Sequence, residues 1–244
     1  GHAHCLGGTE PFCFSANVNL GVRSALESMY DGVIILNHDA LLETPGGFSS
    51  LIASCTPEYG LVSSAIRGAC CNPAQTSEFI AFGKPFGGMV DTDLTVCFVC
   101  VYIPRRTLDL IGLLDERLTG YGRDDDLYCM QVRAAGLKLG VWHGCVVEHN
   151  SLPSSYRTRP DCGELADRNL KIFGDIVRRK QENIHRRTAR KPHVPSGLPP
   201  MRVTSWVSWR SAMMSEPRWP SMACASPMIS GTSATRGSSR KAHS

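Results

Sequence analysis

The sequence predicts an α/β fold, in which helices flank a sheet, followed by a tail without regular structure. Short apolar runs that end in polar residues alternate with segments of helical periodicity, and this alternation predicts the fold. Both patterns stop at about residue 185, which predicts the tail. A chain of 244 residues, 42% of them hydrophobic, is long enough for one domain with a core and an appendage.

The first helix and strand of this pattern lead directly to a group of polar residues. A helix is expected from Asn17, a suitable N-cap, to near Asp31-Gly32, because apolar residues up to Met29 recur at steps of three and four. Val33 to Leu36 form a continuous β-branched and aliphatic run, typical of a strand buried on both faces in a parallel sheet. The polar residues that begin at Asn37 are then expected at the carboxyl edge of the sheet, where open α/β folds bind ligands.

The remaining elements are delimited by Pro, Gly and acidic residues at the ends of helices. A long loop over 67–93 is expected to be a binding segment or disordered. The other expected elements are a helix from Thr44 and Pro45 to Ser54, a strand at 60–64, a strand at 95–103, a helix from Pro104 to Gly112 with Leu108, Leu110 and Ile111 inward, a helix at 124–135, a strand at 137–149 and an amphipathic helix from Asp161 to about Lys180.

The tail over 185–244 is basic and contains Ser, Met and Trp without a period, so we expect disorder. The alternative is a functional tail that contacts a membrane or a polymer. The net charge of +4 comes largely from this region, because the last 44 residues hold six Lys or Arg and a single acidic residue, Glu216. We expect no nucleic acid among the partners.

Eleven cysteines occur at irregular spacings, and several lie in apolar runs, which predicts reduced core thiols; a metal site or a disulfide is the alternative. Cys97 and Cys100 have CxxC spacing, but no second CxxC or paired His follows at zinc-finger distance. No apolar run approaches the roughly 20 residues that span a bilayer, and no secretory signal begins the chain. We expect a cytoplasmic protein, with peripheral association at a membrane surface as a variant of that location.

Two strand ends carry candidate metal ligands. Asp39 follows the strand at 33–36, and its carboxylate suits Mg²⁺ or Mn²⁺. Asn37, two residues earlier, points to the same side of an extended chain and could orient ribose, phosphate or a metal-bound water. His149 ends a second apolar strand, and a neutral imidazole could complete the shell. The alternatives are a turn or cap role for Asp39 and a core or turn role for His149.

A second candidate centre is the triplet of Asp124, Asp125 and Asp126, which follows Gly120 and Gly122. Adjacent carboxylates repel one another, so the proton affinity of at least one should rise, which suits a general base near neutral pH. The flanking glycines allow the backbone to approach a ligand closely. The alternative is a solvated helix N-terminus, where acidic residues are favoured by the helix dipole.

The order of these motifs resembles glycosyltransferase family 2, the inverting family with the GT-A fold. Five segments between residues 14 and 149 carry the resemblance. They are Phe14 to Gly21, similar to an Asn-x-Gly helix start; Asn37-His38-Asp39, similar to an Asp-x-Asp metal motif; Arg105-Arg106 with Ile111 to Arg117; Asp124-Asp125 with Val132 to Gly136; and the late strand that ends at His149.

The resemblance implies an incomplete GT-A, Rossmann-like mixed sheet over residues 1–184, truncated at the front, where the family places its nucleotide-binding strands. It implies a nucleotide-sugar donor, and an acceptor that is a glycan or a lipid-linked sugar. Asp124 and Asp125 fall on the family's Glu-Asp pair and are both candidate catalytic residues, with Asp125 as the base; Asp39 falls on the metal ligand with His149 as companion. Asn19, Asn37 and Asp39 fall on donor-binding positions.

The sequence leaves two alternative hypotheses for the function. A non-catalytic remnant that binds a glycan or a protein would follow if the missing front is essential. A sugar nucleotidyltransferase has a related core, but it needs an N-terminal Gly-rich loop with a basic residue, and the sequence offers none.

Overall fold

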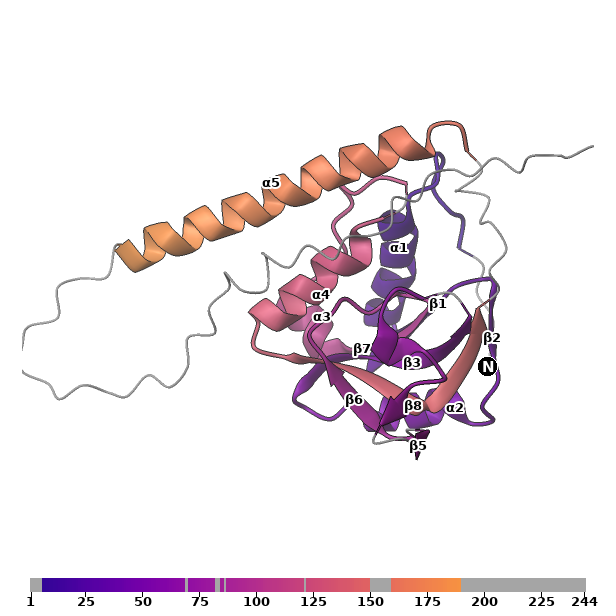
Figure 1. Ribbon diagram of the computed structural model, residues 1–244. Helices are drawn as coiled ribbons and strands as arrows, with labels where there is room; N and C mark the ends of the chain where they lie inside the picture. The colour runs from indigo at the N-terminus through magenta and orange to yellow at the C-terminus, as the bar shows by residue number, and fades with distance from the viewer. Residues whose placement is uncertain are drawn as a thin grey trace, which may run out of the picture. The chain divides into compact units, whose positions relative to one another are not determined.

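The computed structural model describes residues 6–68, 70–81, 84–85, 87–120, 122–149 and 159–189 (Figure 1). All of them lie within one compact unit, Gly1–Lys191. They form a mixed α/β fold in which helices flank a mixed sheet, and this confirms the predicted fold class. The predicted tail lies outside the described residues, except that 185–189 continue the last helix.

The main sheet contains six strands that run in both directions. Their spatial order is β1 (Gly32–Leu36), β7 (Cys100–Pro104), β3 (Tyr59–Gly68), β8 (Lys138–His149) and β2 (Ala40–Leu42), with β6 (Met89–Thr92) also paired to β8. β7 is antiparallel to β1 and to β3, and β3 is parallel to β8. The carboxyl ends of β1, β3 and β8 therefore lie at one edge of the sheet.

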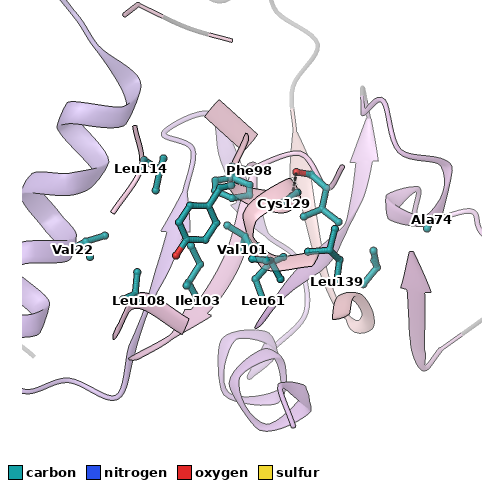
Figure 2. Close-up of a cluster of buried hydrophobic side chains, with 14 residues drawn as sticks. Val22, Leu61, Ala74, Phe98, Val101, Ile103, Leu108, Leu114, Cys129 and Leu139 are labelled. Carbon is teal, nitrogen blue, oxygen red and sulfur yellow. Dashed lines mark hydrogen bonds between the residues drawn. The ribbon is translucent and has the colours of Figure 1, made fainter. Parts of the chain in front are cut away.

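Helices cover both faces of this sheet. α1 (Phe14–Glu27), α3 (Arg105–Ile111) and α4 (Asp124–Ala134) pack on one face, and α2 (Gly47–Ser54) packs on the other. Because side chains alternate along a strand, Leu61 of β3 belongs to the first apolar cluster and Val62 to the second. In the first cluster, shown in Figure 2, Val22 of α1 and Leu108 of α3 pack around the strands.

The last helix, α5 (Cys162–Ala189), adds a third and smaller apolar cluster. Its Ile176 packs against Leu118 and Leu127, which flank the start of α4. The side-chain amide of Asn169 donates to the carbonyl oxygens of Thr119 and Gly122, at 3.0 Å each. α5 thus fixes the segment that leads into the acidic triplet.

Several predicted elements have different bounds in the structure. α1 begins at Phe14, and Asn17 does not cap it; its side chain accepts the N–H of Thr9 instead. The predicted strand at 95–103 begins only at Cys100. Leu110, expected inward, is 63% exposed. The segment 67–93 is not one loop, because it contains η1 (Pro73–Gln75), β4 (Ile80–Ala81), β5 (Lys84–Pro85) and β6.

The environment of β1 also differs from the prediction. β1 lies at one end of the strand order, pairs with the antiparallel β7, and its residues are partly exposed rather than buried on both faces. An apolar run encodes burial but not the direction or number of the neighbouring strands, so the sequence could not show this. Among the described helices, none has the length and apolar character needed to cross a membrane.

Candidate functional site

Strand pairing brings Asp39 and His149 together from positions far apart in the sequence. Ala40 of β2 lies opposite His149 of β8, which places Asp39 beside the imidazole. The carboxylate oxygen Oδ1 of Asp39 lies 3.5 Å from Nε2 of His149, and the two side chains are 27% and 19% exposed. The two predicted metal ligands therefore form a partly buried pair that remains open to solvent on one side.

Gly68 at the end of β3 is a member of this corner that the sequence analysis missed. It lies opposite His149 in the parallel pairing, with a φ of +116°. A Cβ at this position would collide with the carbonyl oxygen of His149. A glycine is thus required for β3 to pass close to the backbone of the histidine. The sequence predicted a strand only at 60–64 and placed Gly68 in the following loop, where a glycine is common, so its proximity to His149 was not visible.

Asn37 holds the turn between β1 and β2. Its N–H donates to the carbonyl oxygen of Val99 at 2.9 Å, and its carbonyl oxygen accepts the N–H of Ala40 at 3.1 Å. These backbone bonds fix the turn on which Asp39 lies. The side chain of Asn37 is partly buried at the same edge, where the sequence predicted it.

The three adjacent carboxylates of α4 occupy three different environments. Asp124 is only 5% exposed; one oxygen accepts the hydroxyl of Ser15 and the other accepts the N–H of Gly122 at 2.9 Å. Asp126 accepts the hydroxyl of Thr95 at 2.7 Å and pairs with Arg123 at 3.0 Å. Asp124 therefore joins α1 to α4, and Asp126 joins α4 to the segment before β7.

Asp125, between them, has the proton affinity that suits a base near neutral pH. Burial, together with the charges of Asp126 and Asp124, raises the pKa of its carboxyl group to about 7. Burial also raises the pKa of Asp124 to about 6, although the bonds from Ser15 and Gly122 oppose the shift. From the sequence, repulsion among the three carboxylates was the expected cause of a raised pKa. In the structure, desolvation of the Asp125 carboxyl group is the larger cause.

The segment 95–99 connects the acidic triplet to the metal-ligand corner. Thr95 bonds Asp126, Cys97 lies against Cys71 of the loop after β3, and Val99 bonds Asn37. The N-terminal turn of α4, which carries Asp125, is thereby tied to the segment that runs to this corner. We call the group of Asn37, Asp39, Asp125 and His149 the carboxyl-edge site.

Asn19 does not belong to this site. Its side chain is fully buried, donates to the carbonyl oxygen of Leu114 and to Glu116 at 2.9 Å, and accepts the N–H of Leu114 at 3.0 Å. The carboxamide is thus committed to holding α1 against the segment after α3. Asn19 was expected to bind the nucleotide-sugar donor; in the structure its side chain makes these internal hydrogen bonds.

Several cysteines lie in the core, as the apolar runs predicted. In the described part of the chain, Cys55, Cys100, Cys129 and Cys145 are buried free thiols. Cys97 is only partly buried; it packs against the edge of the second apolar cluster and also contacts Cys71. The CxxC spacing of Cys97 and Cys100 therefore does not produce a joint site.

Two open hollows lie on the described surface. One, of about 720 Å³, is lined by Glu43, Thr44 and Arg67, with the Arg67 guanidinium 3.0 Å from the Glu43 carboxylate. The other, of about 540 Å³, lies beside α5 and is lined in part by Glu116, which bonds Asn19. Neither hollow is lined by Asn37, Asp39, Asp125 or His149.

Comparisons with protein-family models, with curated proteins and with solved structures give no match to this chain. A functional conclusion therefore depends on the geometry of the described residues and on the motifs that carry the family resemblance.

Proposed function

We propose that the chain is a metal-dependent inverting glycosyltransferase, which moves a sugar from a nucleotide-diphosphate donor to a hydroxyl of a glycan or a lipid-linked acceptor. One observation carries the proposal: Asp39 and His149 form a pair at the edge of the sheet, and the segment 95–99 links this corner to α4, where Asp125 has a pKa of about 7. A cation site beside a carboxylate of this proton affinity is what the reaction requires. The order of the motifs supports the same function.

The donor atoms at the corner fit Mg²⁺ or Mn²⁺ bound together with a diphosphate. Within the described residues, no group of three or more His, Cys, Asp or Glu side chains could hold a metal ion, so the protein offers a pair of ligands. Such cations are commonly held by one or two protein ligands, with phosphate oxygens and water completing the shell. Asp39 and His149 would hold the ion, which when bound offsets the negative charge of the departing diphosphate.

The role of Asp125 follows from its proton affinity. An acceptor hydroxyl is a weak nucleophile, and it becomes competent as it loses its proton. Asp125 takes that proton while the hydroxyl oxygen forms a bond to the anomeric carbon and the bond to the diphosphate oxygen breaks. Because attack comes from the face opposite the leaving group, the anomeric configuration is inverted. Asp124 and Asp126 hold the helix terminus in place and do not transfer the proton.

The test is sugar transfer, measured as nucleotide release from a panel of UDP- and GDP-sugars with Mn²⁺ and simple glycan or lipid-linked acceptors. Asp125→Asn should lower the turnover of the wild-type chain by about 10²-fold or more, because a general base contributes about 10² to 10⁴ in rate. Binding of UDP with Mn²⁺, measured by calorimetry, should be unchanged. Asp109→Asn, at an exposed carboxylate of α3, is the matched control.

Near-normal turnover of Asp125→Asn would reject the assignment of the base. Binding of the nucleotide or a glycan without any transfer would instead support a non-catalytic remnant. An activity assay of the same chain in the presence of anionic vesicles tests the expected association with a membrane surface.

A further inference from the structure

Two thiols at the rim of the carboxyl-edge site lie in direct contact. The sulfurs of Cys71 and Cys97 are 2.7 Å apart, and the N–H of Cys71 donates to the Cys97 sulfur at 3.5 Å. Both are free cysteines, and 26 positions separate them in the sequence. A disulfide bond requires two sulfurs about 2 Å apart, so a small movement would join them.

Two buried side-chain amides hold the thiols in this position. Gln75 accepts the N–H of Cys97 at 2.6 Å and donates to its carbonyl oxygen at 3.1 Å. Asn72 donates to the carbonyl oxygen of Thr95 at 3.0 Å and caps the turn that follows Cys71. Both amides are almost completely buried. The contact between the sulfurs is thus built into the two loops and does not depend on a covalent bond.

The two thiols differ in a way that suits stepwise oxidation. Cys71 is exposed, whereas Cys97 is partly buried. The hydrogen bond between the two sulfurs lowers the pKa of Cys71 and, together with burial, raises that of Cys97. Thiolate character and access decide which thiol attacks first, so Cys71 is the attacking residue and Cys97 the resolving one.

We propose that Cys71 and Cys97 are a redox modification site, at which a reversible disulfide bond forms. The Cys71 thiolate attacks a small-molecule disulfide such as oxidised glutathione, forms a mixed disulfide and releases one thiol. Cys97 then attacks the Cys71 sulfur and displaces the second thiol. Two protein thiols are oxidised, the small disulfide is reduced to two thiols, and the two protons pass to the departing sulfurs.

The bond would join the two loops that hold the site. Thr95 of one loop bonds Asp126, Val99 of the same segment bonds Asn37, and the other loop leads out of β3 at Gly68. A disulfide bond here lowers the conformational entropy of the unfolded chain and restricts the motion of both loops. The oxidised chain should therefore melt about 5 °C higher than the reduced chain. This inference does not depend on the reaction that the site performs.

The experiment equilibrates the full chain in reduced and oxidised glutathione buffers, blocks the free thiols by alkylation, and maps the peptides by mass spectrometry. Trypsin with a protease that cleaves after Glu and Asp separates residues 68–78 from residues 94–105. We expect a linked pair of these peptides in oxidising buffer and its loss in reducing buffer. Cys71→Ser and Cys97→Ser should each abolish the link and the rise in Tm.

Cys70→Ser is the matched control, because Cys70 is adjacent in sequence but its thiol donates to the carbonyl oxygen of Asn72. This variant should keep the full link. Complete alkylation of Cys71 and Cys97 in the wild-type chain under oxidising buffer would overturn the proposal. A link between Cys70 and Cys71, or one that Cys70→Ser removes, would overturn it as well.

Discussion

The metal-ligand corner and the acidic helix terminus are assembled in opposite ways. Asp39 and His149 are 110 positions apart and meet because the register of β2 on β8 places them side by side. Asp124 and Asp125 are adjacent in the sequence, yet the first accepts hydrogen bonds from Ser15 and Gly122, while desolvation raises the pKa of the second to about 7. Strand register thus brings distant residues into contact, and local packing gives adjacent residues different environments. Substitutions should therefore have different consequences in the two regions.

The strongest test of the corner is Gly68→Ala. The collision with the backbone of His149 and the φ of +116° should lower the free energy of unfolding by about 2–4 kcal/mol and displace His149. Urea denaturation measures the first effect, and Mn²⁺-dependent binding of UDP measures the second. Gly46→Ala is the control, because Gly46 has a positive φ of 69° with open space around it, and should cost about 1 kcal/mol. Equal losses in the two variants would show that the approach to His149 is unimportant.

The acidic terminus should respond to Asp124→Asn with a loss of stability. Asp124 accepts hydrogen bonds from the Ser15 hydroxyl and the Gly122 N–H, and the asparagine would turn its NH₂ group toward one of these two donors. We therefore expect the free energy of unfolding in urea to fall by about 2 kcal/mol. Ser15→Ala should cost a similar amount, and the double variant should cost less than the sum. Simple addition of the two effects would indicate that the hydroxyl and the carboxylate act independently.

Loss of a ligand at the corner should affect binding rather than folding. Asp39→Ala and His149→Ala should each weaken Mn²⁺-dependent binding of UDP by about tenfold or more, with little change in Tm. Calorimetry with Mn²⁺ and with EDTA separates the metal-dependent part. Glu43→Ala, beside the corner but paired with Arg67, is the control. Unchanged affinity in both ligand variants would remove the corner from the donor site.

The smallest effect concerns the pH dependence of stability at Asp125. Its pKa is higher in the folded chain, about 7, than the ordinary 3.8, so the folded state binds the proton more tightly. The stability that this provides is complete below about pH 3.8 and is lost as the pH rises to about 7. Asp125→Asn should match the wild type near pH 4 and exceed it by about 1 kcal/mol at pH 8, after allowance for solvent screening. A constant difference between pH 4 and pH 8 would contradict the raised pKa.

The sequence predicted those parts of the fold that local signals define. α4 starts at Asp124 and β8 ends at His149 as expected, because an acidic first turn and the end of an apolar run are readable within a few residues. The contact of Asp39 with His149 was also anticipated, since both end apolar strands. These features together outlined the candidate site.

The parts that the sequence could not predict depend on contacts between distant segments. Asn19 was expected to bind the nucleotide-sugar donor, but its side-chain amide donates a hydrogen bond to Leu114, 95 positions away. Gly68 gained its importance only from the parallel pairing with His149, and Cys71 only from the loop that carries Cys97. No local pattern contains such information, because each role is defined by a partner elsewhere in the chain.

The pH dependence of sugar transfer tests the central claim most directly, because it reports the proton that Asp125 is proposed to accept. The rate for the wild-type chain with Mn²⁺ should rise with pH along a limb centred near pH 7 and then level off, since the base must be ionised. In Asp125→Asn this limb should disappear along with most of the turnover, while the affinity for UDP with Mn²⁺ stays the same. A limb near pH 7 that persists in Asp125→Asn would contradict the account, because the titrating base would then be another group.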